Sequence, residues 1–264
     1  MYKSGFAKVN GTSLNYEMAG EGEAIVLIHS GFTDLRLWDK QFDFFSKSYK
    51  VIRYDVRGFG KSETPSKSFS HIEDLKGLLN FLEVQRVNLI GVSMGGSIAI
   101  DFTLEYPELV KSLILSGPSL NGYQKLAGEV STEVSLATVS IASRDENFEK
   151  SVEFMINTPI WRQNDAESQA RLKNMFLDTS LEWALKDIEV VANPPAAERL
   201  HEIDKKTLLI IGSEDSEPIM KIAKFLEDGI VDLQRVDIKG TGHVPNLDKH
   251  EVFNQIVMEF LDNN

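Results

Sequence analysis

Short runs of apolar residues alternate along most of this chain with segments whose apolar residues recur every three or four positions. Continuous apolar runs are typical of strands buried on both faces, and the longer period is typical of helices that cover a sheet. The runs predict strands over residues 24–29, 51–55, 87–92, 112–115, 207–211 and 233–238. The amphipathic segments predict helices over residues 35–47, 70–82 and 94–106, and further helices from about residues 219 and 251.

The segment over residues 6–18 differs, because its apolar and polar residues alternate one by one. Asn10-Gly11 interrupts the alternation, and this dipeptide is a strong signal for a two-residue β-hairpin turn. Together the elements predict an α/β fold. Helices should cover both faces of a mostly parallel sheet, and the opening hairpin should form its antiparallel edge.

Strand-like runs disappear between Pro118 and Pro195, where the segments are helical and charged. This stretch is too long for a loop. We interpret residues 118–195 as a helical cap inserted over the carboxyl edge of the sheet, and residues 1–117 and 196–264 as the core domain. The large side chains of the cap are expected mainly to pack, and as a group they are able to line an apolar pocket: Phe148, Phe154, Met155, Trp161, Met175, Phe176 and Trp183.

Composition narrows the possible functions. The chain has 264 residues and no cysteine, so disulfides and thiolate chemistry are excluded. Its formal net charge of −12 disfavours nucleic acid and anionic membranes as partners. The first residues lack the apolar core of a signal peptide, and no apolar run has membrane-spanning length, so we expect a soluble, cytoplasmic protein.

The segment Gly91-Val92-Ser93-Met94-Gly95 joins a predicted strand to a predicted helix through a sharp turn. In so tight a turn a Cβ atom at either glycine would collide with neighbouring backbone, and the serine is held in a strained conformation. The strand before the motif and the helix after it favour a nucleophile elbow over a loop that merely needs glycine. Ser93 is therefore the candidate nucleophile.

A serine nucleophile needs a base within hydrogen-bonding reach and an acid that orients this base. Three of the five histidines are explained by a structural role or by exposure to solvent, without a catalytic role: His71, His201 and His250. His29 ends a strand and precedes a turn, whereas His243 lies in Gly240-Thr-Gly-His-Val-Pro, a glycine-flanked loop after the last strand. This topology puts His243 at the same sheet edge as Ser93 and makes it the candidate base.

The acid should also follow a strand at that edge. Asp215, which comes soon after the strand over residues 207–211, is the first choice, with Glu214 and Glu217 as rivals. The order Ser93, Asp215, His243 is that of one known triad arrangement.

Two backbone amides should stabilise the developing oxyanion. The Met94 amide follows the nucleophile at a helix N-terminus, and the Phe32 amide belongs to the turn after the third strand, so these two are the candidates. Gly31, Trp161 and Val244 are the candidate substrate contacts.

Four motifs in the expected order make the chain resemble the α/β-hydrolase superfamily over nearly its whole length. They are His29-Ser-Gly31, Asp55-Val-Arg-Gly-Phe-Gly-Lys-Ser62, the elbow at residues 91–95 and Gly240-Thr-Gly-His243. The resemblance implies an eight-stranded core with a cap after the sixth strand. It also implies that one set of residues in the second motif holds a turn rather than reacts: Asp55, Arg57, Gly58 and Gly60.

Two departures from the family pattern affect the site. Many relatives have His-Gly where this chain has His29-Ser30-Gly31, which leaves the second oxyanion donor open. Pro218 follows Asp215 one residue sooner than is common, so Glu214 and Glu217 both remain candidates for the acid.

Motifs and resemblance together predict a serine hydrolase that needs no metal or organic cofactor. Ser93 would attack an acyl carbonyl while His243 takes its proton and Asp215 fixes the imidazole. The expected small-molecule substrate is a small or medium carboxylic ester, a lactone or a β-diketone-type C–C bond. Serine at this position argues against haloalkane dehalogenases and epoxide hydrolases, which use an aspartate there.

Three alternatives stay open. The same triad serves C–C lyases, cofactor-free haloperoxidases and acyltransferases. The pocket could instead bind a small ligand in a signalling receptor with slow turnover, or the protein could be a structural relative without activity. Because this superfamily hosts many chemistries on one scaffold, resemblance does not separate these alternatives, and the oligomeric state is not readable from the sequence.

Overall fold

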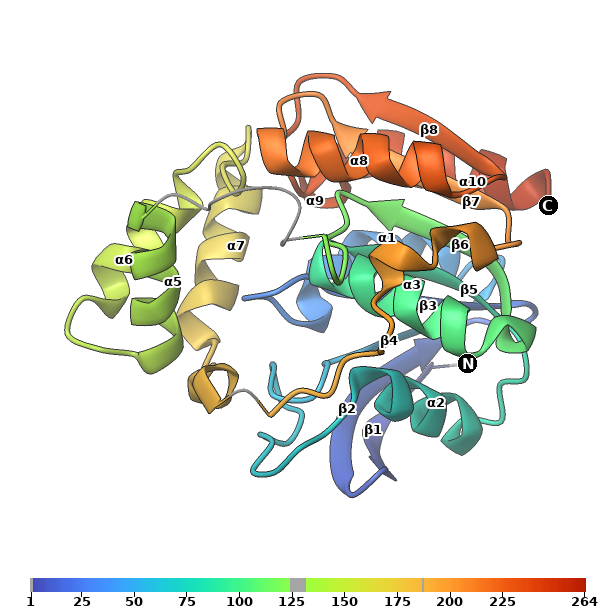
Figure 1. Cartoon of the computed structure of the whole chain (residues 1–264), viewed down its shortest axis with the longest axis horizontal. Helices are drawn as coiled ribbons and strands as arrows, with labels where there is room; N and C mark the ends of the chain where they lie inside the picture. Colours follow the sequence, from blue (N-terminus) through green and yellow to red (C-terminus); the bar gives the residue numbers. More distant parts are fainter. Residues whose placement is uncertain (1, 124–131, 187) are drawn as a thin grey trace.

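One eight-stranded sheet forms the centre of the computed structural model, which describes residues 2–123, 132–186 and 188–264 (Figure 1). The strands are β1 (Tyr2–Val9), β2 (Thr12–Ala19), β3 (Ala24–Ile28), β4 (Lys50–Tyr54), β5 (Val87–Val92), β6 (Val110–Ser116), β7 (Thr207–Gly212) and β8 (Leu233–Ile238). Their spatial order is β1-β2-β4-β3-β5-β6-β7-β8. The strands from β3 to β8 run parallel, while β1 and β2 pair antiparallel, so the predicted α/β architecture is confirmed.

The hairpin between β1 and β2 turns at the two residues that the sequence indicated. Asn10 and Gly11 both have positive φ, at 46° and 68°. A two-residue turn of this hand requires positive φ at both positions, and asparagine and glycine adopt it with least strain. Val9 and Thr12 consequently pair directly across the turn.

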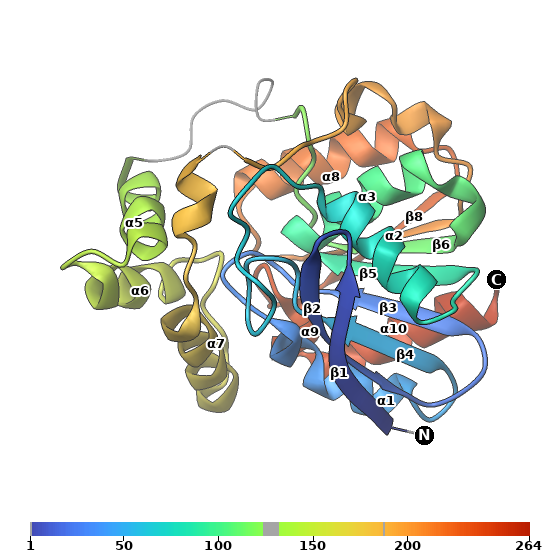
Figure 2. The same cartoon turned by 90° about the horizontal axis from the view of Figure 1, so that it is seen from below.

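Helices lie on both faces of the sheet (Figures 1 and 2). They are α1 (Asp39–Phe45), α2 (His71–Phe81), α3 (Met94–Glu105), α5 (Thr132–Ser143), α6 (Phe148–Ile156), α7 (Ala166–Asp178), α8 (Glu217–Gly229), α9 (Pro245–Asp248) and α10 (His250–Asp262). Short 3-10 turns are η1 (Leu35–Trp38), η2 (Pro107–Leu109), η3 (Glu182–Lys186), η4 (Ala196–Glu198) and η5 (Leu200–Glu202). The segment predicted as one helix over residues 35–47 is therefore divided into η1 and α1.

Alternate side chains of the strands enter two separate cores. On β3, Val26 and Ile28 pack with apolar residues of α2, α3 and α8, whereas Ile25 and Leu27 pack with those of α1 and α10. A strand buried on both faces presents successive side chains to opposite layers, which explains its continuous apolar run.

The region predicted to form the cap contains α5, α6, α7 and η3 in its described part. In both views α5, α6 and α7 gather at one side of the sheet (Figures 1 and 2). Of the seven aromatic and methionine side chains expected to pack there, all are buried except Phe154, which is 43% exposed. Residues 124–131 and 187 of this region lie outside the described residues, and the domain boundaries at 118 and 195 stay a prediction. In the described parts of the chain, no helix has the length and apolar character needed to cross a bilayer.

Candidate active site

Ser93 lies at a tight turn between β5 and α3, with φ 53° and ψ −115°. Such a backbone conformation costs a non-glycine residue roughly 1–3 kcal/mol. A Cβ atom on Gly91 would come within 2.2 Å of the Gly95 carbonyl oxygen, and one on Gly95 within 2.2 Å of the Ile28 carbonyl oxygen. Both glycines are therefore required for the turn that presents Ser93, as the motif predicted.

His243 and Asp215 form a buried hydrogen-bonded pair. His243 Nδ1 lies 2.9 Å from Asp215 Oδ2, and the two side chains are 3% and 0% exposed. The other carboxylate oxygen of Asp215 accepts a hydrogen bond from the Ser216 backbone N–H at 2.7 Å. Because Nδ1 donates to the carboxylate, Nε2 is the ring nitrogen that remains able to accept a proton.

The two rival carboxylates are placed differently. Glu214 is exposed, and Glu217 extends into solvent, where it pairs with Lys221 at 2.9 Å. Of the three acidic residues weighed from the sequence, the structure brings Asp215 alone to His243.

Ser93 and His243 both lie next to the end of β6. The Ser93 backbone N–H donates to the Ser116 carbonyl oxygen at 3.0 Å, and the following residue, Gly117, lies against the His243 ring. Among the described residues, the Ser93 hydroxyl forms no hydrogen bond with His243. Hydrogen bonds of this kind are often long before substrate binds and tighten in the complex.

The candidate oxyanion donors lie in two turns at this edge. Phe32 has a positive φ of 60°, and its ring stacks on Phe176 with centroids 5.1 Å apart. Thr179 Oγ1 donates to the Phe32 carbonyl oxygen at 3.2 Å, which further restrains the backbone on the carboxyl side of Phe32. Within residues 2–123, 132–186 and 188–264, neither the Phe32 nor the Met94 backbone N–H has a protein acceptor, so both are available to a ligand.

His29 supports the turn that carries Phe32. Its buried ring donates through Nδ1 to the Ser30 carbonyl oxygen at 2.8 Å and accepts the Val56 N–H at Nε2 across 3.0 Å. Burial lowers the pKa of His29, so the ring is neutral in this role. Both nitrogens are thereby occupied, and His29 is not free to act as a base.

The other histidines lie away from this arrangement. His71 is buried between Phe69 and Trp183, and burial lowers its pKa to about 3. His201 lies exposed in η5, and His250 begins α10.

The three candidate substrate contacts have different surroundings. The Trp161 ring packs edge-to-face against the His243 ring, with centroids 5.4 Å apart and planes at 87°, and it also contacts Phe176. A Cβ atom on Gly31 would meet nothing within 4 Å, so this residue borders open space. Val244 is only 1% exposed and packs into the core with α10.

The second sequence motif holds a turn, as the resemblance implied. The Asp55 carboxylate accepts hydrogen bonds from the Asn15 side chain and from the Leu35 and Lys61 backbone N–H groups, each at 2.8 Å. A Cβ atom on Gly60, where φ is 52°, would lie 2.4 Å from the Asp55 carboxyl group. Arg57 is occupied by an ion pair with Asp74.

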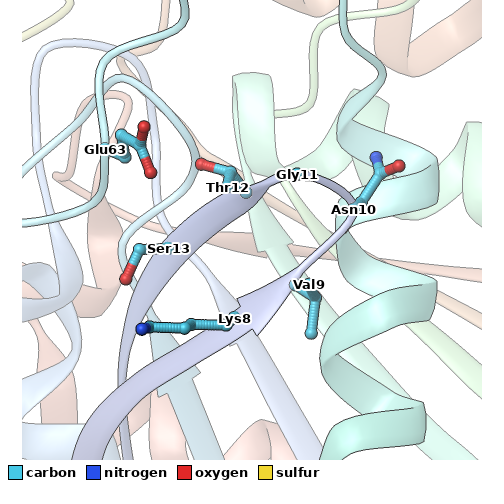
Figure 3. Close-up of a pocket in the computed structure, with 7 residues that line it drawn as sticks. All are labelled: Lys8, Val9, Asn10, Gly11, Thr12, Ser13 and Glu63. Atoms are coloured by element: carbon cyan, nitrogen blue, oxygen red, sulfur yellow. The ribbon is translucent and has the colours of Figure 1, made fainter.

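A separate hollow of about 340 Å³ lies at the β1–β2 hairpin, and none of the candidate site residues lines it (Figure 3). It is lined by Lys8, Val9, Asn10, Gly11, Thr12, Ser13 and Glu63. Across the described residues, no three His, Asp or Glu side chains converge in a group able to hold a metal ion.

Comparison with known proteins identifies the family of the chain. Residues 23–250 match the alpha/beta hydrolase fold family, so the chain belongs to the α/β-hydrolases and is an enzyme of the hydrolase class. It is 28% identical to the 2-hydroxy-6-oxo-6-phenylhexa-2,4-dienoate hydrolase of Comamonas testosteroni, over 98% of this chain and 96% of that protein. It is 30% identical to the 2-hydroxy-6-oxononadienedioate/2-hydroxy-6-oxononatrienedioate hydrolase of Escherichia coli O81 (strain ED1a), over 94% and 90% of the two chains.

Solved structures have the same fold. The enol-lactonase of Burkholderia xenovorans LB400 superimposes with a TM-score of 0.83 at 25% identity, over 98% of this chain and 100% of that one. A bromoperoxidase of Bacillus anthracis superimposes with a TM-score of 0.81 at 22% identity, again over 98% and 100% of the two chains. At that lower identity the likeness concerns the fold alone.

Proposed function

We propose that this enzyme is a serine hydrolase that cleaves a small or medium carboxylic ester or a lactone, with Ser93 as nucleophile, His243 as base and Asp215 as acid. The observation that carries the proposal is the 2.9 Å hydrogen bond between the buried Asp215 carboxylate and His243 Nδ1. This bond leaves Nε2 as the ring nitrogen that can accept a proton, and the strained serine turn lies at the same sheet edge.

In the first half-reaction the Ser93 oxygen attacks the acyl carbonyl carbon while His243 Nε2 removes the hydroxyl proton. The resulting imidazolium is stabilised by the Asp215 carboxylate. The carbonyl oxygen becomes negative, and the free N–H groups of Met94 and Phe32 are the donors we assign to it. Breakdown of the tetrahedral intermediate breaks the acyl–oxygen bond, the alcohol takes its proton from His243, and an acyl-serine is left. The alcohol of an ester departs, whereas the alcohol of a lactone stays attached to the acyl group.

In the second half-reaction His243 removes a proton from water, and the hydroxide attacks the acyl-serine. Collapse of this intermediate frees the carboxylic acid and returns the proton to Ser93. No step in this sequence requires a metal or an organic cofactor.

The aromatic side chains beside the proposed base favour a substrate with an apolar acyl group. Trp161, Phe32 and Phe176 contact one another within 6.4 Å between ring centroids. A cluster of this kind gains free energy by covering apolar surface, at roughly 25 cal/mol for each Å².

Hydrolysis of a C–C bond is a second candidate function, and the names of the relatives favour it. Two relatives that match over at least 94% of this chain are named as hydrolases of 2-hydroxy-6-oxo-dienoate compounds. In such a substrate Ser93 would attack the ketone carbonyl, the adjacent C–C bond would break, and the departing carbon would take the proton from His243.

Parallel assays of the purified enzyme distinguish the two functions. p-Nitrophenyl esters of increasing acyl length, a set of lactones and a 2-hydroxy-6-oxo-6-phenylhexa-2,4-dienoate solution would be compared by kcat/KM, with Ser93→Ala as control. The ester proposal predicts that an ester or lactone has the highest value. A dienoate preference of 100-fold or more would replace it with the C–C function, and equal rates for Ser93→Ala would refute both.

A further inference from the structure

The His243 loop is covered by residues 158–164, a short segment that follows α6. This segment belongs to the inserted region, which is the predicted cap over residues 118–195. The His243 backbone N–H donates to the Ile160 carbonyl oxygen at 3.2 Å, and the next residue along that segment, Trp161, packs its ring against the imidazole. The base is therefore held both at its backbone and at its ring by residues that do not belong to the sheet's own loops.

The segment over residues 158–164 and the His243 loop approach so closely that a side chain at Gly242 has no room. A Cβ atom on Gly242 would lie 2.8 Å from the Pro159 carbonyl oxygen. Two further hydrogen bonds secure the contact, because the Asn164 side-chain amide donates to the Gly240 carbonyl oxygen at 2.7 Å and its backbone N–H donates to Asp248 at 2.8 Å.

Gly117 also lies against the His243–Asp215 pair. A Cβ atom on this residue would lie 3.0 Å from His243 Nδ1 and 3.1 Å from Asp215 Oδ2, closer than nearly all real Cβ contacts. Gly117 also has a positive φ of 46° and donates its N–H to the Ile210 carbonyl oxygen at 3.0 Å, so its backbone cannot easily retreat.

We propose that Trp161 and Gly117 are positioning residues that restrain the His243–Asp215 pair, so that the segment over residues 158–164 takes part in positioning the base. The proposal rests on the proposed function, in which His243 is the base. It gives Trp161 a different role from that of a plain pocket wall: the indole restricts the rotation of the imidazole, and Gly117 leaves the space in which the Nδ1–carboxylate bond forms. Misplacing a catalytic group by about 1 Å costs on the order of 10²-fold in rate.

The test compares Trp161→Ala and Gly117→Ala with Gly11→Ala. Gly11 is the matched control, because its φ of 68° imposes the same kind of backbone strain while a Cβ atom there would meet nothing within 4 Å. Two readouts are recorded: the pH profile of kcat and KM on p-nitrophenyl esters of short and long acyl chains, and the low-field proton NMR signal of the His243 Nδ1–H, assigned by its loss in Asp215→Asn.

The positioning role predicts that both variants lower kcat by roughly 10- to 100-fold at every acyl length. It also predicts that both shift the kinetic pKa of the base and weaken or displace the Nδ1–H signal, whereas Gly11→Ala changes neither readout. If Trp161→Ala changes only KM and acyl-length preference while the NMR signal stays in place, Trp161 is a pocket wall and the proposal is wrong. An unchanged signal in folded Gly117→Ala overturns the other half.

The NMR signal also separates this proposal from the proposed function. If no ester, lactone or dienoate is turned over but the signal responds as described, the positioning stands and the assigned reaction fails. If turnover depends on Ser93 but the NMR signal is unchanged in Trp161→Ala and Gly117→Ala, the proposed reaction stands and the positioning role is wrong.

Discussion

Ser93 donates its backbone N–H to the carbonyl oxygen of Ser116 across 3.0 Å, which joins the strained serine turn to the end of the neighbouring strand β6. The residue after Ser116 is Gly117, which lies against both His243 and Asp215. One short stretch of backbone thus supports the proposed nucleophile on one side and the proposed base and acid on the other. This shared support makes the geometry of the site sensitive to small changes at the end of β6.

Replacement of the acid gives a direct prediction. Asp215→Asn should lower kcat by about 10⁴-fold, because an amide in this position favours the wrong imidazole tautomer and leaves the imidazolium without a counter-charge. Glu217→Gln and Glu214→Gln serve as matched controls and should keep most of the activity, since both side chains face solvent. Steady-state kinetics on the best substrate would decide the matter, and loss of activity in a glutamate variant with retention in Asp215→Asn would reassign the acid.

Substitution of the elbow glycine Gly95 should destabilise the protein far more than substitution of Gly31, which lies in the turn after β3. Gly95→Ala should lower the free energy of unfolding by about 4 kcal/mol or more, because its Cβ atom would meet the Ile28 carbonyl oxygen at 2.2 Å. Gly31→Ala has open space around the new methyl group and should change stability by less than about 1 kcal/mol. Urea unfolding monitored by circular dichroism measures both, and equal midpoints would show that the turn relaxes without cost.

A buried carboxylate outside the site gives a prediction that depends on pH. Asp101 on α3 accepts a hydrogen bond from Asn121 through one oxygen, while the other oxygen is buried and has no partner among the described residues. Burial raises its pKa to about 6 from the ordinary value of 3.8. Between these pH values the folded protein holds more protons than the unfolded chain, so this group lowers stability as pH rises from about 4 to about 6.

Asp101→Asn should therefore increase the free energy of unfolding at pH 7.5, by roughly 1–3 kcal/mol, since it removes the buried charge and keeps an acceptor for Asn121. The gain should disappear near pH 4, where Asp101 is protonated. Urea titrations of both proteins at the two pH values test the sign. A gain of the same size at both pH values would mean that ionisation of Asp101 is not its cause.

Much of the core could be predicted because its signals are local. The apolar run at β5 and the two flanking glycines are enough to predict the elbow, and the clash that requires Gly91 is with Gly95, only four residues away. The clash that requires Gly95 is with the distant Ile28 carbonyl oxygen, but the motif already places glycine there. The Asn10-Gly11 turn is equally local. At η1 the prediction was less accurate, because the Asp34 side chain accepts the Arg36 backbone N–H at 2.9 Å and starts the segment as a 3-10 turn.

The parts of the site that the sequence left open or did not indicate depend on contacts between distant segments. Three acidic residues within the five positions after β7 look alike in sequence, and only the packing of the His243 loop distinguishes the buried one. Gly117 carries no motif, yet its missing Cβ leaves room for a pair formed almost 100 and more than 120 residues later. The contact of Trp161 with His243 joins the inserted region to the last loop and has no counterpart in local periodicity.

The most direct test of the proposed nucleophile is an intact-mass spectrum after incubation with a fluorophosphonate probe, recorded for the wild type and for Ser93→Ala. An activated serine predicts one adduct on the wild type that is absent from the variant, together with a loss of turnover of roughly 10⁴- to 10⁶-fold in Ser93→Ala. An adduct that persists in Ser93→Ala, or a folded wild type that takes up no probe, would contradict the assignment of Ser93 as the nucleophile.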